Sequence, residues 1–240
     1  MAPSMTQIRR RRFVLAAAAL AALGTALPLA LPAAEPSKPY VARGTKQSIV
    51  PVVKRLLLKP GEGGQKVQNF APLGPLQVEG FDVPEEQSPV VDSFVGELGV
   101  FYGFDSPKGI AFSNMLDLKA LGVARDEVRK LATVNYRRLY PGLRLERLRP
   151  GLFLVVDGGE LESSVLLDPV FWERQKLSVS GELVAAAPAR DVVLFSGSNP
   201  RENIAELRRI ADQIFRKGHE NLLSSNLYVW RGGRWEVFGE

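Results

Sequence analysis

Short apolar runs separated by turn residues dominate the pattern of hydrophobic and polar positions, most clearly in the central stretch 143–196. The run Leu152–Val156 precedes Asp157-Gly158, a dipeptide that favours a tight turn between antiparallel strands. The next run, Leu161–Leu167, alternates between apolar and polar residues, as a strand with one exposed face does. The centre of the chain therefore predicts a β-hairpin.

Further apolar runs predict more hairpins along the chain. Residues 183–187 and 192–195 flank Pro188, which marks a bend, an edge or a bulge because proline donates no ladder hydrogen bond. Paired runs around turn residues also occur nearer both ends: 99–104 with 110–112, and 227–230 with 235–238. Together these runs predict an antiparallel or mixed sheet built from hairpins.

Three segments show helical spacing of apolar residues: 48–58, 117–140 with a break near Gly122, and 200–217. Asn199 is the expected N-cap of the third segment. In the second, Asn135 shares a face with apolar residues, which either a structural hydrogen bond or a ligand contact would explain. The strands and helices predict an α+β fold, with about three main helices packed on the sheet.

Residues 1–34 have the pattern of a targeting segment. Four consecutive arginines precede an apolar run that extends to Ala34, which is the order found in export signals. Arg10, Arg11 and Phe13 resemble the twin-arginine motif for export of folded proteins, with an ordinary signal peptide or an uncleaved anchor as alternatives. The segment predicts a periplasmic or secreted protein that meets the membrane only through its N-terminus.

The remaining chain divides into a linker at 35–47, rich in proline and basic residues, and a single predicted domain at 48–240. The formal net charge is +5, but 27 basic and 26 acidic residues remain once the four arginines of the export segment are removed. This balance does not favour nucleic-acid binding. Because the chain contains no cysteine, disulfides and thiol catalysis are excluded.

The sequence lacks the residues that most common catalytic sites require. His219 is the single histidine, and it follows a predicted helix end, where a cation is electrostatically favoured. One histidine without cysteine argues against a zinc site, and a serine triad would need that same histidine. The sequence also lacks a phosphate-binding loop and a dinucleotide fingerprint. We therefore predict no cofactor and no metal site.

Carboxylates and arginines remain as candidates for chemistry. Aspartates occur at predicted strand ends and turns, where paired carboxylates could act as acid and base or bind calcium or magnesium: Asp105, Asp157, Asp168 and Asp191. The same positions suit ordinary turn chemistry. Arg190-Asp191 is a structural ion pair, a strand-terminating turn, or an arginine that binds a small anionic ligand. Asn135, Arg190 and Asp191 are the predicted ligand-binding residues.

Tryptophans offer another possible binding surface. Trp172, Trp230 and Trp235 could line a groove for a partner, since aromatic residues are enriched at interfaces. Aromatic residues paired across a hairpin are equally common as stabilisers of a sheet.

Several short motifs resemble the YtpQ-like bacterial proteins, a family without an assigned function. They occur in order over nearly the whole chain after the linker: Ile49–Val53, Gly99–Asp105, Ala132–Leu139, Ser163–Asp168, Pro188–Asp191 and Leu227–Trp230. The resemblance implies a mixed α+β domain and supplies no catalytic residues. The N-terminal export segment departs from the family's pattern.

Two functions are compatible with these observations. The first is an exported, non-catalytic module of the cell envelope that binds a protein or a small anionic ligand. The alternative is a hydrolase-like enzyme that uses aspartate or glutamate with arginine, with or without a hard cation. An enzyme would gather its polar residues in one cleft, whereas a binding module would expose an apolar or aromatic patch.

Overall fold

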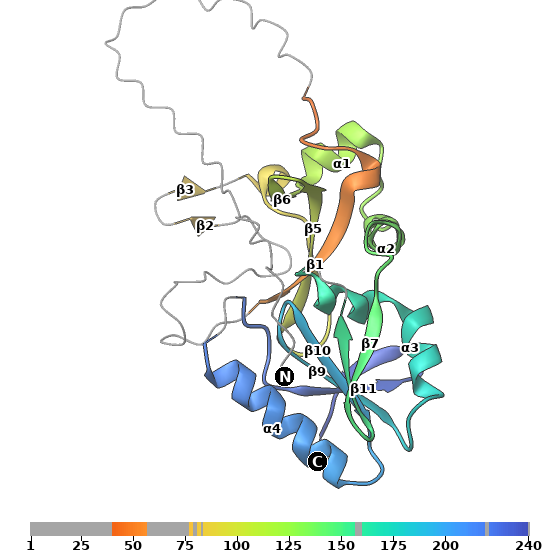
Figure 1. The fold of residues 1–240 in the computed structure, drawn as a ribbon. Coiled ribbons are helices and arrows are strands. Elements are labelled where there is room, and N and C mark those ends of the chain that lie inside the picture. The colour runs from red at the N-terminus through yellow and green to blue at the C-terminus, as the bar shows by residue number, and fades with distance from the viewer. Residues whose placement is uncertain are drawn as a thin grey trace, which may run out of the picture.

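The computed structural model describes residues 40–56, 77–78, 81–82, 84–156, 160–218 and 221–239. They form an α+β fold in which antiparallel sheets are combined with helices (Figure 1). The predicted fold class is therefore confirmed. Several predictions fall outside the described residues: the export residues Arg10, Arg11 and Phe13, the Asp157-Gly158 turn, and His219.

One sheet is formed around the long strand β5. Its strands are β1 (Ile49–Arg55), β4 (Val91–Ser93), β5 (Leu98–Ser106) and β6 (Gly109–Phe112). The order is β1-β5-β4, and β6 also pairs with β5. The hairpin β5–β6 confirms the one predicted from residues 99–112.

The predicted helix at 48–58 is wrong, because Ile49–Arg55 forms strand β1. Isoleucine and valine occupy four of its seven positions, and β-branched side chains favour extended backbone. The first five residues are all buried, so both faces are apolar and the two-residue alternation that marks a strand is missing. Pro51 is compatible with β1 because this strand lies at the edge of its sheet.

The second sheet contains six antiparallel strands in the order β12-β11-β9-β10-β8-β7. The strands are β7 (Arg144–Arg149), β8 (Leu152–Val156), β9 (Leu183–Ala189), β10 (Val192–Gly197), β11 (Leu227–Arg231) and β12 (Arg234–Val237). The predicted hairpins β9–β10 and β11–β12 are confirmed, and the register shift between Val192 and Leu194 places a bulge beside Pro188.

Helices α1 (Met115–Leu121) and α2 (Val128–Leu139) confirm the predicted helical segment and its break. Asn114 caps α1 by accepting a hydrogen bond from the Asp117 amide. Gly122 ends α1 with a φ of 58°, a left-handed conformation that suits glycine. Helix α2 then packs against β1 of the first sheet (Figure 1).

The predicted strand at Leu161–Leu167 is wrong, since Glu162–Leu167 forms the 3-10 helix η3. All six residues are buried, so the serines lie inside the fold and not on an exposed face. The Ser164 hydroxyl donates to the Pro51 carbonyl of β1 at 2.7 Å, and the Ser163 amide donates to the Arg190 carbonyl at 2.9 Å. These hydrogen bonds let η3 join the two sheets.

Helix α3 (Pro169–Lys176) was not predicted from the sequence. Asp168 caps it by accepting a hydrogen bond from the Phe171 amide, and proline occupies its first turn. The Asp-Pro dipeptide is an ordinary helix-start signal and would have located this helix.

Helix α4 (Glu202–Arg216) confirms the predicted third helical segment. Its N-cap is Arg201, so the prediction of Asn199 as the cap is wrong. The Asn199 amide group donates instead to the Ser180 hydroxyl at 3.2 Å. Ile204, Leu207 and Ala211 are buried against one face of the six-stranded sheet.

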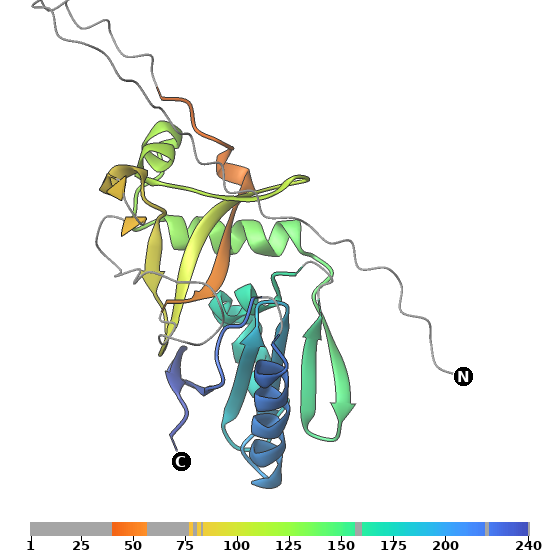
Figure 2. The same cartoon turned by 90° about the vertical axis from the view of Figure 1, so that its left-hand side faces the viewer.

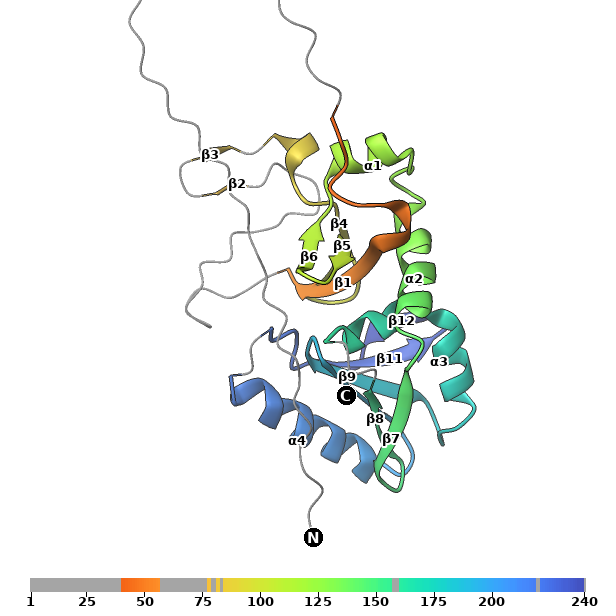
Figure 3. The ribbon, with the colours of Figure 1, turned by 45° about the horizontal axis from the view of Figure 1, so that its top comes forward.

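The hydrophobic core has two parts, separated by the six-stranded sheet. The larger part combines residues of both sheets with α2, η3 and Trp172 of α3, and the smaller part lies between α4 and the opposite face of the six-stranded sheet. Figures 1 and 3 accordingly show α3 and α4 on opposite sides of that sheet.

Short elements complete the described structure: the 3-10 helices η1 (Lys46–Ser48) and η2 (Glu85–Gln87), and the strand pair β2 (Gln77–Val78) and β3 (Phe81–Asp82). None of the helices in the described ranges combines the length and the apolar character needed to cross a bilayer.

Candidate functional site

Asn135 of α2 connects this helix to η1 and to the start of β1 through hydrogen bonds. Its side-chain amide donates to the Lys46 carbonyl at 2.7 Å and to the Ile49 carbonyl at 2.9 Å. Asn135 is buried, and these bonds satisfy the donors of its side-chain amide. The polar residue on an apolar helix face therefore has a structural role, and a ligand contact by Asn135 stays a prediction.

Arg190 lies in the two-residue turn between β9 and β10 and is only 4% exposed. Its Nε donates to the Glu160 carbonyl at 3.0 Å, and one terminal nitrogen donates to Asn221 Oδ1 at 3.1 Å. The Glu160 carboxylate lies 3.6 Å from the other terminal nitrogen. Arg190 thus connects two segments that are distant in sequence.

Both of these partners have unusual backbone conformations. Glu160 and Asn221 each have a φ of 68°, and among the described residues they are the two non-glycine residues with positive φ. Such conformations have a free-energy cost unless surrounding contacts hold them. The guanidinium of Arg190 supplies those contacts, whereas its sequence neighbour Asp191 is exposed.

Arg190 influences a second cation, Lys54, and both are affected by burial. Burial lowers the pKa of its guanidinium. Burial also lowers the pKa of Lys54 in β1, and the charge of Arg190 lowers it further. The Lys54 ammonium lies 4.8 Å from the ring centre of Phe112, within range of a cation–π contact. Whether Arg190 or Asp191 also contacts an anionic ligand stays a prediction.

Two of the candidate carboxylates, Asp105 and Asp168, are held by structural partners. Asp105 accepts a hydrogen bond from the Tyr140 hydroxyl at 3.0 Å. Asp168 caps α3. Its carboxylate also accepts a hydrogen bond from Arg137 Nε at 2.5 Å and another from a terminal nitrogen of the same arginine. The two hydrogen bonds from Arg137 together form a bidentate ion pair that connects α2 to α3.

Two aspartates that the sequence analysis did not select are more extensively bonded. Asp117, which is buried, accepts hydrogen bonds from Tyr40, from Arg43 and from the Asn114 amide. Although burial acts to raise its pKa, these donors together lower it. Asp92 likewise binds Tyr102 and Arg125 of neighbouring elements. Both carboxylates connect segments of the fold, and within the described ranges no metal-binding group of three or more acidic or histidine residues occurs.

The prediction that the three tryptophans line a groove is wrong. Trp172, Trp230 and Trp235 are 0%, 4% and 6% exposed. The Trp172 ring makes edge-to-face contacts with Phe195 and with Trp235, with ring centres 5.5 and 4.9 Å apart. These aromatic residues therefore form the part of the core that lies between α3 and the six-stranded sheet.

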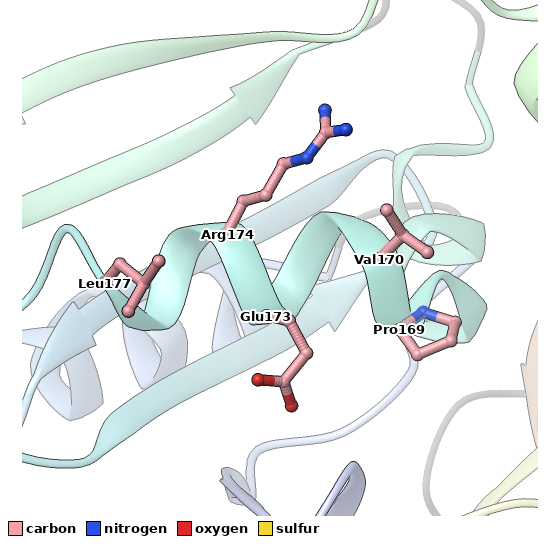
Figure 4. A pocket seen from close by; sticks show the side chains of 5 residues that line it. All are labelled: Pro169, Val170, Glu173, Arg174 and Leu177. Atoms are coloured by element: carbon pink, nitrogen blue, oxygen red, sulfur yellow. The ribbon is translucent and has the colours of Figure 1, made fainter.

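A shallow groove of about 470 Å³ lies along the outer side of α3 (Figure 4). Its described lining comes from five residues of this region: Pro169, Val170, Glu173, Arg174 and Leu177. Glu173 accepts a 2.7 Å hydrogen bond from the Trp230 indole, which fixes one wall. Figure 4 shows Arg174 leaving the helix in the opposite direction. None of the predicted ligand-binding residues lines this groove.

Strand β7 is exposed along its whole length, although it belongs to a sheet. Leu145 pairs with Val155, and Arg147 pairs with Phe153. Val155 belongs to the same core as Trp172, and Phe153 packs against that core. Because directly paired residues share a face of a sheet, Leu145 and Arg147 lie on the face that α3 covers farther along. We call the surface made by Leu145, Arg147, Val170, Arg174 and Leu177 the α3–β7 face.

Three exposed apolar side chains belong to this face. Leu145, Val170 and Leu177 are among the nine exposed large apolar side chains of the described residues. Leu177 is 87% exposed. Sequence periodicity missed this surface, because a leucine in a strand or next to a helix is ordinarily expected to be buried. The closely spaced arginines of β7 were the available signal.

The chain is similar to UPF0354 proteins, which are uncharacterised bacterial proteins. It is 26% identical over 148 residues to one from Listeria innocua serovar 6a and 21% identical over 154 residues to one from Bacillus cytotoxicus. The matches cover 61% and 63% of this chain, but only 55% and 57% of the two relatives. The chain thus spans little more than half the length of the curated relatives it matches.

Other comparisons add no relative. No family model matches the chain, and no solved structure matches it significantly. The finer resemblance to YtpQ-like proteins stays a prediction. What the comparisons support is similarity to UPF0354 proteins, a bacterial family without an established activity.

Proposed function

We propose that this chain is an exported, non-catalytic binding module of the cell envelope, and that a partner protein docks on its α3–β7 face. The observation that carries the proposal is a set of three exposed apolar side chains on this face, Leu145, Val170 and Leu177, of which the last two also line the groove along α3. Contiguous exposed apolar surface commonly marks a site of protein association.

The charges of this face favour a partner segment that is acidic as well as apolar. Strand β7 contains three arginines and one glutamate, and Arg174 adds another positive charge from α3. Complementary charge increases the association rate and selects the correct partner. The hydrolase alternative has less support, because Asp105 and Asp168 bind structural partners.

Substitution of Val170 tests the docking face. Val170 is 48% exposed, and Val237 of β12, at 47%, is a matched control on another part of the surface. A photo-crosslinker at position 170 in source cells should yield one protein adduct that the same crosslinker at position 237 does not yield. For that protein, once purified, Val170→Asp should weaken binding at least about tenfold, because a charge would enter an apolar contact. Val237→Asp should leave the affinity unchanged. Equal binding by the two variants would contradict docking at this face.

Export is tested by cell fractionation with N-terminal sequencing. We expect a processed periplasmic protein in cells with a working twin-arginine pathway and its loss when that pathway is disabled, because Arg10, Arg11 and Phe13 match the motif. The control is the double variant Arg10→Lys with Arg11→Lys, which keeps the charge and should abolish processing. Full-length protein in the cytoplasm of wild-type cells would contradict the export proposal.

A further inference from the structure

Strand β7 lies at one edge of the six-stranded sheet, and among the described strands it pairs with β8 alone (Figure 2). An edge strand presents unpaired backbone N–H and C=O groups, which can pair with an added strand. The opposite edge, β12, is a shorter strand that contains the buried Trp235. Strand β1, at the edge of the other sheet, has five buried residues among its seven. Strand β7 differs because all six of its residues are exposed.

We propose that β7 receives an extended acidic segment of the partner protein as an added antiparallel or parallel strand. This inference rests on the proposed function and gives its mode of binding. Strand addition uses main-chain hydrogen bonds for affinity and alternate side chains for specificity. The regular stretch 144–147 supplies the pairing edge, because the register with β8 shifts only after Arg147.

The side chains of β7 define the chemistry of the added strand. Arg144, Arg147 and Arg149 provide positive charge on both faces of the hairpin, whereas Glu146 is its single acidic residue. A neighbouring strand with acidic residues opposite Arg144 and Arg147 and an apolar residue opposite Leu145 would place opposite charges and apolar groups within contact distance across the strand pair. Two of these arginines already have acidic partners, since Arg149 forms an ion pair with Glu206 of α4 at 3.2 Å and Arg144 forms one with Glu146 at 3.3 Å.

Arginine at a sheet edge also has an ordinary role, which is to prevent edge-to-edge aggregation. The leucines distinguish the two roles. Leu145 is 36% and Leu148 48% exposed, and a strand whose surface served only to repel other strands would not present them. Leu145 lies on the α3–β7 face, so an apolar residue of an added strand would continue the contact toward the groove of α3.

The test uses the synthetic eight-residue peptide Glu-Val-Val-Glu-Glu-Val-Val-Glu, added to the purified full chain, because this order can place glutamate opposite Arg144 and Arg147 and valine opposite Leu145. The peptide should bind, and hydrogen exchange should slow at those amides of residues 144–149 that point away from β8, because they become part of a new ladder. A peptide with every second residue N-methylated loses the donors on one edge and should bind at least about tenfold more weakly. Replacement of glutamate by lysine should weaken binding by a similar factor.

Matched variants locate the contact. Arg147→Glu should weaken binding of the peptide at least about tenfold, since it reverses a charge on β7. Arg234→Glu, on the opposite edge strand, should leave binding unchanged. Unchanged affinity after N-methylation, absence of binding, equal effects of the two variants, or self-association of the chain through β7 would each overturn strand addition. The Val170 result remains informative in those cases, because it concerns docking on α3 and does not require an added strand.

Discussion

Replacement of Trp172 by alanine is expected to lower the free energy of unfolding by about 3–5 kcal/mol. Trp172 has no exposed surface, and it joins α3 to the six-stranded sheet through edge-to-face contacts with Phe195 and Trp235. Its indole N–H also donates to the Val165 carbonyl of η3 at 2.7 Å. Alanine would leave a large cavity and an unpaired carbonyl. Urea denaturation of the purified chain measures the loss.

Leu177→Ala is the matched control for this prediction. Leu177 follows the same helix but is 87% exposed, so its truncation should change stability by less than about 0.5 kcal/mol. Trp172→Phe keeps an aromatic ring without the N–H and should have an intermediate effect. If Trp172→Ala were no more destabilising than Leu177→Ala, α3 would not be anchored through this ring.

Replacement of Arg190 by alanine should lower the free energy of unfolding by about 3 kcal/mol, because it removes the buried partner of several polar groups. The Glu160 carbonyl and Asn221 Oδ1 would each lose a donor. The left-handed conformations of Glu160 and Asn221 would also lose the contacts that hold them. Thermal and urea denaturation measure the change.

Asp191→Ala is the control that tests whether Arg190 is stabilised by its sequence neighbour Asp191, as the predicted ion pair implies. Asp191 is exposed, so this variant should change stability by less than about 0.5 kcal/mol. A loss equal to that of Arg190→Ala would show that the adjacent Asp191, and not Glu160 or Asn221, is the essential partner. An unchanged melting temperature of Arg190→Ala would contradict the structural role altogether.

The sequence by itself determined the local elements whose signals are strong. The hairpins β5–β6, β9–β10 and β11–β12 and the helices α2 and α4 follow from turn residues and from clear helical spacing, which depend on neighbours in the chain. Glycine at position 122 marked the end of α1 correctly, because a left-handed residue is required there.

The tertiary structure decided where local patterns were ambiguous or where partners were distant. An apolar run such as Ile49–Val53 fits a helix or a strand until pairing with β5 decides between them, and the serines of η3 look exposed until their buried hydrogen bonds are known. Arg190 binds residues 30 and 31 positions away, which spacing does not reveal. The α3–β7 face arises because burial depends on which surfaces the fold leaves uncovered, and this is a property of the packed chain.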